Sequence, residues 1–247
     1  MKVGLLQCDD LAAEEVETYG NYPALYSRLL HSADDTIEVE TWRVHEGELP
    51  DDTLAVDAWL ISGSKASAYD GADWIESLKS FVRLLWDERR PLVGICFGHQ
   101  IMAAALGGRV EKCARGWGLG TAVNRVGKVA PWMDPERETF RLVVVHQDQV
   151  TSLPATGSVL AGSEFCPNFM VQYDECFLGI QGHPEFPIGL ARLLHAERES
   201  LLAEAARSSQ RASLEETPDD RLVAVWMVDF MEHAMMESQS HALIRSG

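Results

Sequence analysis

The sequence predicts an α/β protein with a mostly parallel, doubly wound central sheet. Three observations support this prediction. Short apolar runs alternate with segments of helical periodicity over residues 1–108, which is typical of a parallel sheet wound by helices. Short segments with β character follow over residues 109–181, and residues 190–236 have a helical composition. A chain of 247 residues suits one large α/β domain. We therefore expect a single domain over residues 1–247, with residues 190–247 as a helical extension.

The first half of the chain is expected to alternate strands and helices. Continuous apolar runs indicate buried strands, and apolar residues that recur every three or four positions indicate helices. The segment over residues 74–87 illustrates the helical pattern, because Ile75, Leu78, Val82 and Leu85 fall on one face. The expected strands are Val3–Gln7, Ile37–Val44, Ala58–Ser62 and Leu92–Cys96, and the expected helices are Tyr22–His31, Trp74–Asp87 and a segment after Cys96 that ends at Gly107 and Gly108.

The second half is expected to extend the sheet and then to become helical. Turn-rich stretches such as 131–135 and 153–157 separate the β segments. A segment over residues 190–214, rich in Ala, Leu, Glu and Arg, predicts one long helix, and Pro218 begins another that reaches about Met236. The expected strands of this half are Leu119–Val126, Thr139–Val145, Val159–Ser163, Met170–Tyr173 and Phe177–Gln181.

The composition narrows the class of function. The chain carries 38 acidic and 21 basic residues, a formal net charge of −17, which argues against nucleic acid as a partner because phosphate binding needs clustered Lys and Arg. No apolar run reaches 18 residues and no signal peptide is evident, so no membrane span is expected. The five cysteines form no disulfide or metal-ligand pattern. We expect a cytoplasmic protein without metal or other cofactor.

The segment PLVGICFGHQIMAAALGG, residues 91–108, places a thiol between a strand and a helix. The apolar run ends at Cys96, a tight Phe97–Gly98 turn follows, and a helix-like segment comes next. This order is typical of a nucleophile elbow. The N-terminus of a helix favours the thiolate form of a cysteine, which is the reactive form. A backbone N–H just after the nucleophile is also suited to stabilising an oxyanion.

The segment FLGIQGHPEFP offers a proton-transfer partner for that thiolate. His183 follows an expected strand, and α/β sheets carry their sites at the carboxyl ends of strands. Pro184 restricts the backbone beside it, and Glu185 is near enough in sequence to orient the imidazole. A nucleophile, a base and an orienting carboxylate form a catalytic triad in its cysteine version. Because 87 positions separate Cys96 from His183, only the fold can bring them together.

The strings GICFGHQ and GHPE together resemble the class I, triad-type glutamine amidotransferase family. Three further segments support the resemblance: LISGSKASAYDGADWI at residues 60–75, VVVHQDQVTSLP at 143–154 and GGRV at 107–110. Within the family, the HQDQV segment and the SGS…YD…WI segment are similar to those of stand-alone members related to the glutaminase domain of GMP synthase. This subgroup includes plant γ-glutamyl peptidases. The resemblance implies a flavodoxin-like three-layer sandwich with a mostly parallel central sheet, a β-rich extension and C-terminal helices.

The resemblance also implies an activity, which is cleavage of a γ-glutamyl amide through a thioester, and a set of site residues. The implied catalytic residues are Cys96, His183 and Glu185, the implied oxyanion donors are backbone N–H groups of Phe97, Gly63 and Ser64, and the implied substrate-binding residues are Gln100, His146 and Gln147. His146 also ends an expected strand, so a role as the base is a second reading for it. The small-molecule substrate would be glutamine or a γ-glutamyl peptide.

The chain departs from the family pattern in two places. Trp117 and Leu119 stand in a Gly-rich segment where many members carry an acidic residue, and the early loop reads Ser-Gly-Ser where many relatives read Ser-Gly-Gly-Pro. These departures put free glutamine in question as the preferred substrate. Three alternatives stay open: a glutaminase that feeds a synthase partner in trans, a free-standing γ-glutamyl peptidase, and a non-catalytic sensor or interaction protein. An ester hydrolase of the dienelactone hydrolase kind fits the HPE and SGS segments less well.

Overall fold

A computed structural model describes the backbone of residues 1–245 and the side chains of residues 1–240. Residues 246 and 247, the end of the expected helical extension, lie outside the described residues. None of the helices described is both long enough and apolar enough to cross a membrane.

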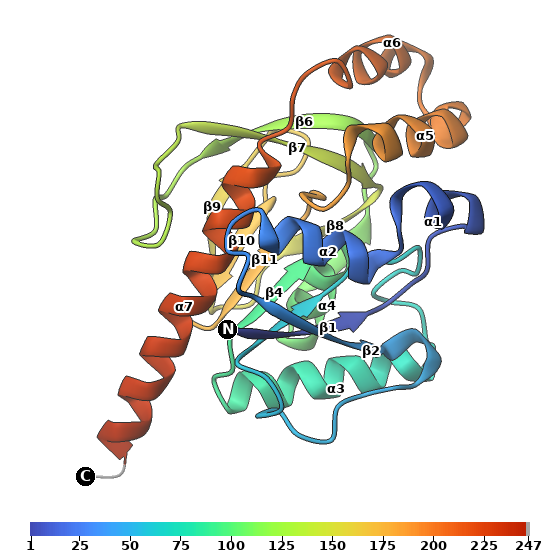
Figure 1. The fold of residues 1–247 in the computed structure, drawn as a ribbon. Coiled ribbons are helices and arrows are strands. Elements are labelled where there is room, and N and C mark those ends of the chain that lie inside the picture. Colours follow the sequence, from blue (N-terminus) through green and yellow to red (C-terminus); the bar gives the residue numbers. More distant parts are fainter. Residues whose placement is uncertain (246–247) are drawn as a thin grey trace.

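Among the described residues, the strands form one large mixed sheet and one small ribbon (Figure 1). The strands are β1 (Lys2–Gln7), β2 (Glu38–Arg43), β3 (Ala58–Ile61), β4 (Leu92–Ile95), β5 (Arg109–Lys112), β6 (Gly118–Val126), β7 (Thr139–His146), β8 (Asp148–Ser152), β9 (Gly157–Gly162), β10 (Met170–Tyr173) and β11 (Phe177–Ile180). The large sheet has the order β2-β1-β3-β4-β11-β10-β9-β6-β7, and β5 pairs with β8 in the ribbon. The first five strands in that order pair in parallel and the others antiparallel.

Helices cover both faces of the sheet (Figure 1). The helices are α1 (Ala13–Tyr19), α2 (Tyr22–His31), α3 (Asp73–Asp87), α4 (Phe97–Ala105), α5 (Ile188–Arg198), α6 (Glu204–Ser213) and α7 (Asp220–Arg245), with short 3-10 turns η1 (Val44–Glu46) and η2 (Glu199–Leu201). Neighbouring residues of a strand point to opposite faces, so Leu60 joins the core built with α2 and α7, whereas Ile61 joins the core built with α3 and α4. Burial of these apolar faces from water is the main force that holds the three layers together.

This arrangement confirms the predicted fold class. Five parallel strands form the central part, the antiparallel strands β10, β9, β6 and β7 form the β-rich extension, and the C-terminal segment is helical. The predicted strands and the helices α2 and α3 lie within about two residues of their expected ends. The expected turn at Phe97–Gly98 is already helical, because α4 begins at Phe97 and the sharp turn falls on Cys96 itself.

The prediction of one long helix over residues 190–214 is wrong. The chain forms α5, then η2, and begins α6 only at Glu204. No Pro or Gly marks the break, so its cause is tertiary. Leu202 lies buried in the connection, whereas α6 buries none of its own residues. The final helix is also longer than expected, since α7 continues to Arg245. The short helix α1 and the strand β8 were not expected from the sequence.

The helix α6 is fixed to the exposed edge of β6 through polar contacts. The first half of β6 pairs with β7 on one side only, because its pairing with β9 begins at Arg125. On the free side, the Leu119 N–H donates to Gln210 Oε1 across 2.9 Å, and the Thr121 N–H donates to Ser213 Oγ across 2.9 Å. Side chains of α6 therefore satisfy backbone groups that a neighbouring strand would otherwise have to satisfy.

Candidate active site

Three neighbouring parallel strands bring the predicted catalytic segments to one edge of the sheet. In the order β3-β4-β11, the loop of Gly63 and Ser64 follows β3, Cys96 follows β4, and His183 comes three residues after β11. The registers Ile61↔Gly94 and Ile95↔Ile180 align the carboxyl ends of these strands. Sites in α/β proteins form at this edge, and the fold thus brings together residues that are far apart in the sequence.

Cys96 occupies a strained backbone turn between β4 and α4. Its φ is 52° and its ψ is −100°, a region that side chains with a Cβ rarely adopt. Two glycines make the close approach of strand and helix possible. A Cβ at Gly94 would lie 2.6 Å from the carbonyl carbon of Gly98, and a Cβ at Gly98 would lie 2.6 Å from the Ile61 oxygen. The spacing Gly94-x-Cys96-x-Gly98 is therefore a sequence signal for the elbow, one that the sequence analysis did not use.

His183 and Glu185 form a buried, oriented pair. The imidazole Nδ1 lies 2.8 Å from Glu185 Oε1, and both side chains are almost fully buried. The Tyr26 hydroxyl donates to the same Oε1 across 3.2 Å. The His183 N–H donates to the Val143 oxygen across 2.8 Å, which ties the segment to β7. Since Nδ1 is held by the carboxylate, the other ring nitrogen, Nε2, is the one left for proton transfer.

The surroundings of His183 favour its charged form. Burial is the largest single influence and by itself lowers the pKa of His183. The negative charges of Glu185 and of the Cys96 sulfur, together with hydrogen bonds to both groups, outweigh burial and raise the pKa of His183 to about 10. A protonated imidazole beside the sulfur is the arrangement that favours a thiolate–imidazolium pair.

The imidazole packs closely against Phe186 and Gly63. Phe186 stacks on it with ring centroids 4.2 Å apart and planes inclined by 3°. Gly63 lies close to the same ring, because a Cβ at Gly63 would be 2.9 Å from His183 Cε1. Only glycine leaves room for the imidazole here, which gives a steric reason for Gly63 independent of any oxyanion role. The sequence pattern alone did not indicate Phe186.

Two backbone N–H groups face the elbow region without a partner. Phe97 is the first residue of α4, where an N–H has no acceptor within the helix. Within residues 1–245, no hydrogen bond occupies the N–H of Phe97 or that of Ser64. Of the two loop residues, Gly63 and Ser64, only Ser64 lines the cavity, which makes it the better placed oxyanion donor.

Gln181 belongs to the site, although the sequence pattern predicts only that it ends a strand. Its Nε2 donates to Cys96 Sγ across 3.5 Å, and its Oε1 accepts from Gln100 Nε2 across 3.2 Å. Gln100 Nε2 also donates to the Asp148 oxygen across 2.9 Å. Gln100 was predicted to bind substrate; here its amide connects the sulfur, through Gln181, to β8. The position of Gln181, two residues before His183, is the signal that would have found it.

His146 lies in the same cavity but in a different electrostatic setting. Its Nδ1 lies 3.2 Å from the Asp148 oxygen, and its Nε2 has no hydrogen-bond partner among the described residues. Burial lowers the pKa of His146 to about 3, so the ring is neutral at physiological pH. No carboxylate orients it, in contrast to His183. Gln147 lines the cavity as well, and its backbone oxygen accepts from the Cys113 N–H.

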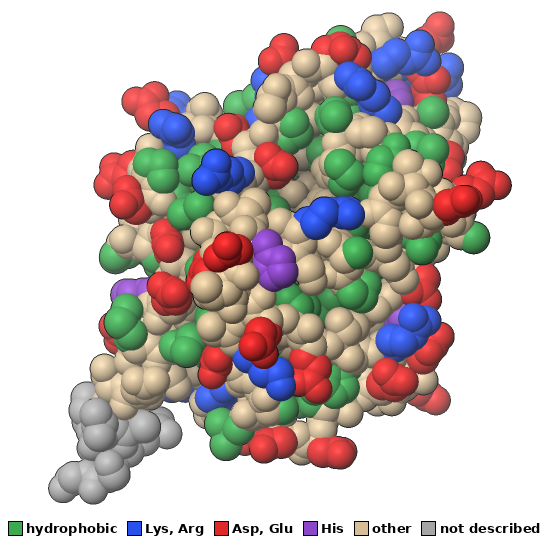
Figure 2. Space-filling model, viewed as in Figure 1, with side chains coloured by type: hydrophobic (Ala, Val, Ile, Leu, Met, Phe, Trp, Pro, Cys, Tyr) green, Lys and Arg blue, Asp and Glu red, His purple; other side chains and the backbone are tan. Residues whose placement is uncertain are grey.

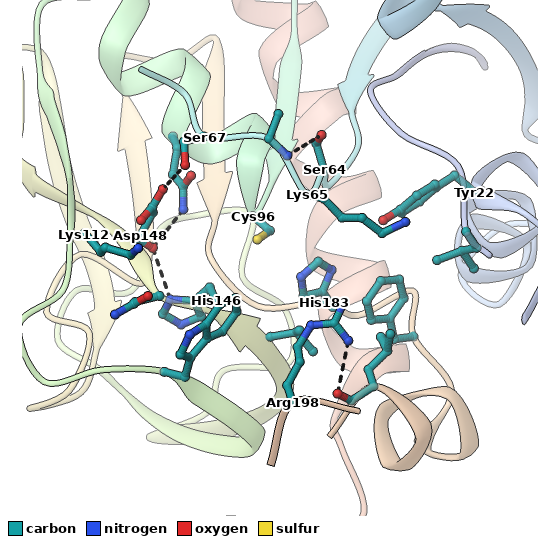
Figure 3. Close-up of a pocket in the computed structure, with 18 of the residues that line it drawn as sticks. Tyr22, Ser64, Lys65, Ser67, Cys96, Lys112, His146, Asp148, His183 and Arg198 are labelled. Carbon is teal, nitrogen blue, oxygen red and sulfur yellow. Dashed lines mark hydrogen bonds between the residues drawn. The ribbon is translucent and has the colours of Figure 1, made fainter. Parts of the chain in front are cut away.

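These side chains surround one cavity of about 450 Å³ (Figure 3). Cys96 and His183 lie near each other close to its centre, with Ser64 above and His146 and Asp148 to one side. A volume of this size suits a small-molecule ligand. All predicted catalytic, oxyanion and substrate-binding residues except Glu185, Phe97 and Gly63 line it directly. Glu185 and Gly63 contact His183, and Phe97 follows Cys96 in the chain.

The described side chains include one group with metal-ligand spacing, formed by Asp10, His45 and Glu46. The Arg43 guanidinium already lies 2.8 Å from Asp10 Oδ2 and 2.7 Å from Glu46 Oε1. A cation there would be repelled by the arginine, so this cluster is an ion-pair network and does not fit a metal.

The elbow, the imidazole–carboxylate pair and the mixed sheet define a class I glutamine amidotransferase. A family model described as glutamine amidotransferase class-I matches residues 17–197, and the chain belongs to that family. The resemblance seen in GICFGHQ and GHPE is thereby confirmed.

Two kinds of curated relative share sequence with this chain, a γ-glutamyl peptidase and a GMP synthase. The chain is 34% identical over 179 residues to γ-glutamyl peptidase 4 of Arabidopsis thaliana, which covers 69% of this chain and 70% of that protein. It is 35% identical over 144 residues to the glutamine-hydrolysing GMP synthase of Porphyromonas gingivalis, but this covers 56% of the chain and only 26% of the synthase.

Solved structures agree on the fold. A glutamine amidotransferase from Thermotoga maritima superimposes with a TM-score of 0.71 at 16% identity and covers 95% of this chain and 98% of its own. A glutamine amidotransferase from Methylobacillus flagellatus gives a TM-score of 0.71 at 18% identity and covers 96% and 94%. At this level of identity the likeness concerns the fold alone.

Proposed function

We propose that this protein hydrolyses a γ-glutamyl amide through a γ-glutamyl thioester on Cys96. In the first half of the reaction, the Cys96 thiolate attacks the γ-carbonyl carbon. The imidazolium of His183 gives its proton to the leaving nitrogen, the C–N bond breaks, and an amine or ammonia departs. In the second half, neutral His183 takes a proton from water as that water attacks the thioester. The C–S bond breaks, glutamate is released, and the thiolate–imidazolium pair is restored.

Both halves pass through a tetrahedral intermediate with a negatively charged oxygen. The N–H groups of Phe97 and Ser64 are the proposed donors to it. The loss of one such donor typically costs about 3 kcal/mol of transition-state stabilisation. Glu185 is the proposed orienting group, which holds the imidazole and stabilises its charge without itself transferring a proton.

The observation that supports this proposal most is the 2.8 Å contact of His183 with Glu185, on a ring that shares one cavity with the strained Cys96 elbow. A protein that served only as a scaffold would have no need of a strained cysteine beside a clamped, charged imidazole. The non-catalytic alternative is therefore the weaker one. Free thiol chemistry also favours a reducing compartment such as the cytoplasm.

Glutamate release from γ-glutamyl dipeptides and from glutamine tests the proposal directly. Wild type is expected to release glutamate, and Cys96→Ala to release none. Cys176→Ala is the matched control, because Cys176 is also a buried free cysteine but lies at the opposite end of β11. An electrophilic glutamine analogue should modify Cys96 in the folded protein. Activity that survives Cys96→Ala would refute the thioester mechanism.

A second candidate is a glutaminase subunit that supplies ammonia to a synthase in trans. The partial match to GMP synthase supports it, since that enzyme is named as glutamine-hydrolysing. The longer matches to γ-glutamyl peptidases favour the stand-alone hydrolase instead. Glutamine turnover that appears only after a partner protein is added would favour the glutaminase.

A further inference from the structure

The cavity has two chemically different sides, divided by the Cys96–His183 pair (Figure 3). Lys65, Tyr22 and Arg198 lie on the side of His183, whereas His146, Asp148 and Lys112 lie on the other side of Cys96. In the proposed reaction His183 delivers a proton to the leaving nitrogen, so the leaving group must lie on the side of His183. The glutamyl part then extends to the other side, toward Gln100 and His146.

The side of the leaving group is partly apolar and carries two cations, Lys65 and Arg198. Leu11, Tyr22, Phe186 and Leu194 form its apolar wall. Ammonia, the leaving group of glutamine, would need neither this wall nor a charge. The two cations are unusual in a chain with a net charge of −17, whose acidic side chains are spread widely over the face seen in Figure 2. Their position in the cavity would suit an anionic ligand.

Arg198 is held in place at the C-terminal end of α5. Its Nη1 donates to the Leu194 oxygen across 3.2 Å and to Glu197 Oε2 across 2.9 Å, and its side chain is 21% exposed. No hydrogen bond to the described residues occupies its Nη2 or Nε. Glu197 offsets little of the charge, because its side chain is 50% exposed and solvent screens the pair. One edge of the guanidinium fork thus stays available for a carboxylate.

The carboxylates that line the same cavity are already engaged. Glu15 Oε2 accepts from the Ala12 N–H across 2.7 Å, and Asp148 Oδ2 accepts from the Ser67 hydroxyl across 2.6 Å. Lys65 donates to the Asp10 oxygen across 3.0 Å and lies 3.9 Å from Asp9, but its side chain remains 59% exposed. Of the two cations beside His183, Arg198 is the less exposed and is held by two hydrogen bonds. It is therefore better suited than Lys65 to bind an anionic group in a fixed position.

We infer that Arg198, assisted by Lys65, is the specificity-determining residue that binds a carboxylate on the leaving group. The substrates would then be γ-glutamyl amides of amino acids or short peptides with a free carboxylate, in preference to free glutamine. This inference rests on the proposed function. Arg198 lies just beyond residues 17–197, the part matched by the family model, so the resemblance to the family does not by itself assign it a role.

The test compares three substrates that share the γ-glutamyl part: γ-glutamylglycine, γ-glutamylglycinamide and glutamine. For wild type we expect kcat/KM for γ-glutamylglycine to exceed that for the glycinamide by about tenfold, as for one charge-assisted hydrogen bond. Arg198→Gln should remove most of this preference by lowering activity on γ-glutamylglycine alone, and Arg198→Lys should keep part of it. High salt should lower the ratio of kcat/KM for γ-glutamylglycine to kcat/KM for the glycinamide in wild type, because salt screens the charge of Arg198.

Arg83→Gln is the control, because Arg83 lies on α3, does not line the cavity and donates to the Ser80 hydroxyl. The substrate preference of this variant should equal that of wild type. Equal losses on both dipeptides in Arg198→Gln would overturn the inference, since Arg198 would then bind the shared glutamyl part or act structurally. If wild type hydrolysed γ-glutamylglycine and γ-glutamylglycinamide equally well, the role inferred for Arg198 would also be overturned. The proposed hydrolysis of γ-glutamyl amides would not be affected by that result. If none of the three compounds gave Cys96-dependent glutamate, both would fail.

Discussion

The amide of Gln181 lies 3.5 Å from the sulfur of Cys96 and donates to it from the neighbouring strand end. The same side chain accepts from Gln100, which in turn donates to the backbone of Asp148. The nucleophile is therefore held by its own strained turn and also by a chain of amides that crosses from β11 to α4 and β8.

Gln181→Leu should lower kcat/KM by about tenfold, which corresponds to one lost hydrogen bond to a charged sulfur. The fold should persist, because leucine fills a similar volume and Gln100 keeps its contact with Asp148. Steady-state kinetics and thermal unfolding would measure the two effects. An unchanged kcat/KM would show that the amide does not act on the thiolate.

Gly63→Ala should reduce turnover by about a hundredfold. The added methyl would lie 2.9 Å from His183 Cε1, and a misplacement of about 1 Å in a catalytic group has an effect of this size. Gly71→Ala, in the same loop, is the control, because a Cβ there meets nothing within 4 Å. Full activity in Gly63→Ala would mean that the imidazole has more room than the structure describes.

Glu185→Gln should harm turnover less than His183→Ala, and it should also change the pH profile. His183 must be protonated to release the leaving nitrogen, so activity persists below its pKa and falls as the pH rises through about 10. Removal of the Glu185 charge lowers that pKa, and the alkaline limb of kcat/KM should move to lower pH. A greater loss in Glu185→Gln than in His183→Ala would contradict the assigned roles.

His146→Gln should raise KM several-fold and change kcat by less than twofold. Burial lowers the pKa of His146 to about 3, so the ring is neutral in the working range and glutamine is a neutral polar replacement. His146 lines the cavity on the side proposed for the glutamyl part, and its buried Nε2 has no hydrogen-bond partner among the described residues. The pH profile above pH 5 should stay the same. A large loss of kcat in His146→Gln would indicate that His146, and not only His183, takes part in proton transfer.

Cys96→Gly should be inactive but about 1 kcal/mol more stable than Cys96→Ala. At a φ of 52° both cysteine and alanine have a strained Cβ, and glycine does not. Chemical denaturation of the two variants gives the difference. Equal stabilities would indicate that the elbow carries no backbone strain.

Much of the site could be predicted from the sequence because it depends on local patterns. A cysteine between an apolar run and a helix can be recognised as a nucleophile elbow without knowledge of how the strands pair. The same holds for a His-Pro-Glu segment that follows another apolar run. The strand order explains why they meet, since β4 and β11 are neighbours in the sheet although 81 residues lie between the end of β4 at Ile95 and the start of β11 at Phe177.

Other features required the tertiary structure. The contact of Gln181 with the sulfur depends on the register of two strands, and the steric role of Gly63 depends on where the imidazole lies. The break between α5 and α6 has no local signal, and Arg198 reaches the cavity only because that helix ends beside it. Assignment of all 247 residues to one domain stays a prediction.

The attachment of α6 to β6 has a practical consequence for anyone who trims the chain to the part shared with its family. Without Gln210 and Ser213, the amides of Leu119 and Thr121 would be bare along an open strand. Such an edge recruits strands from other molecules. A version shortened after residue 198 would lose this cover and also the core side chains of α7, so it should aggregate during purification even with its catalytic groups intact.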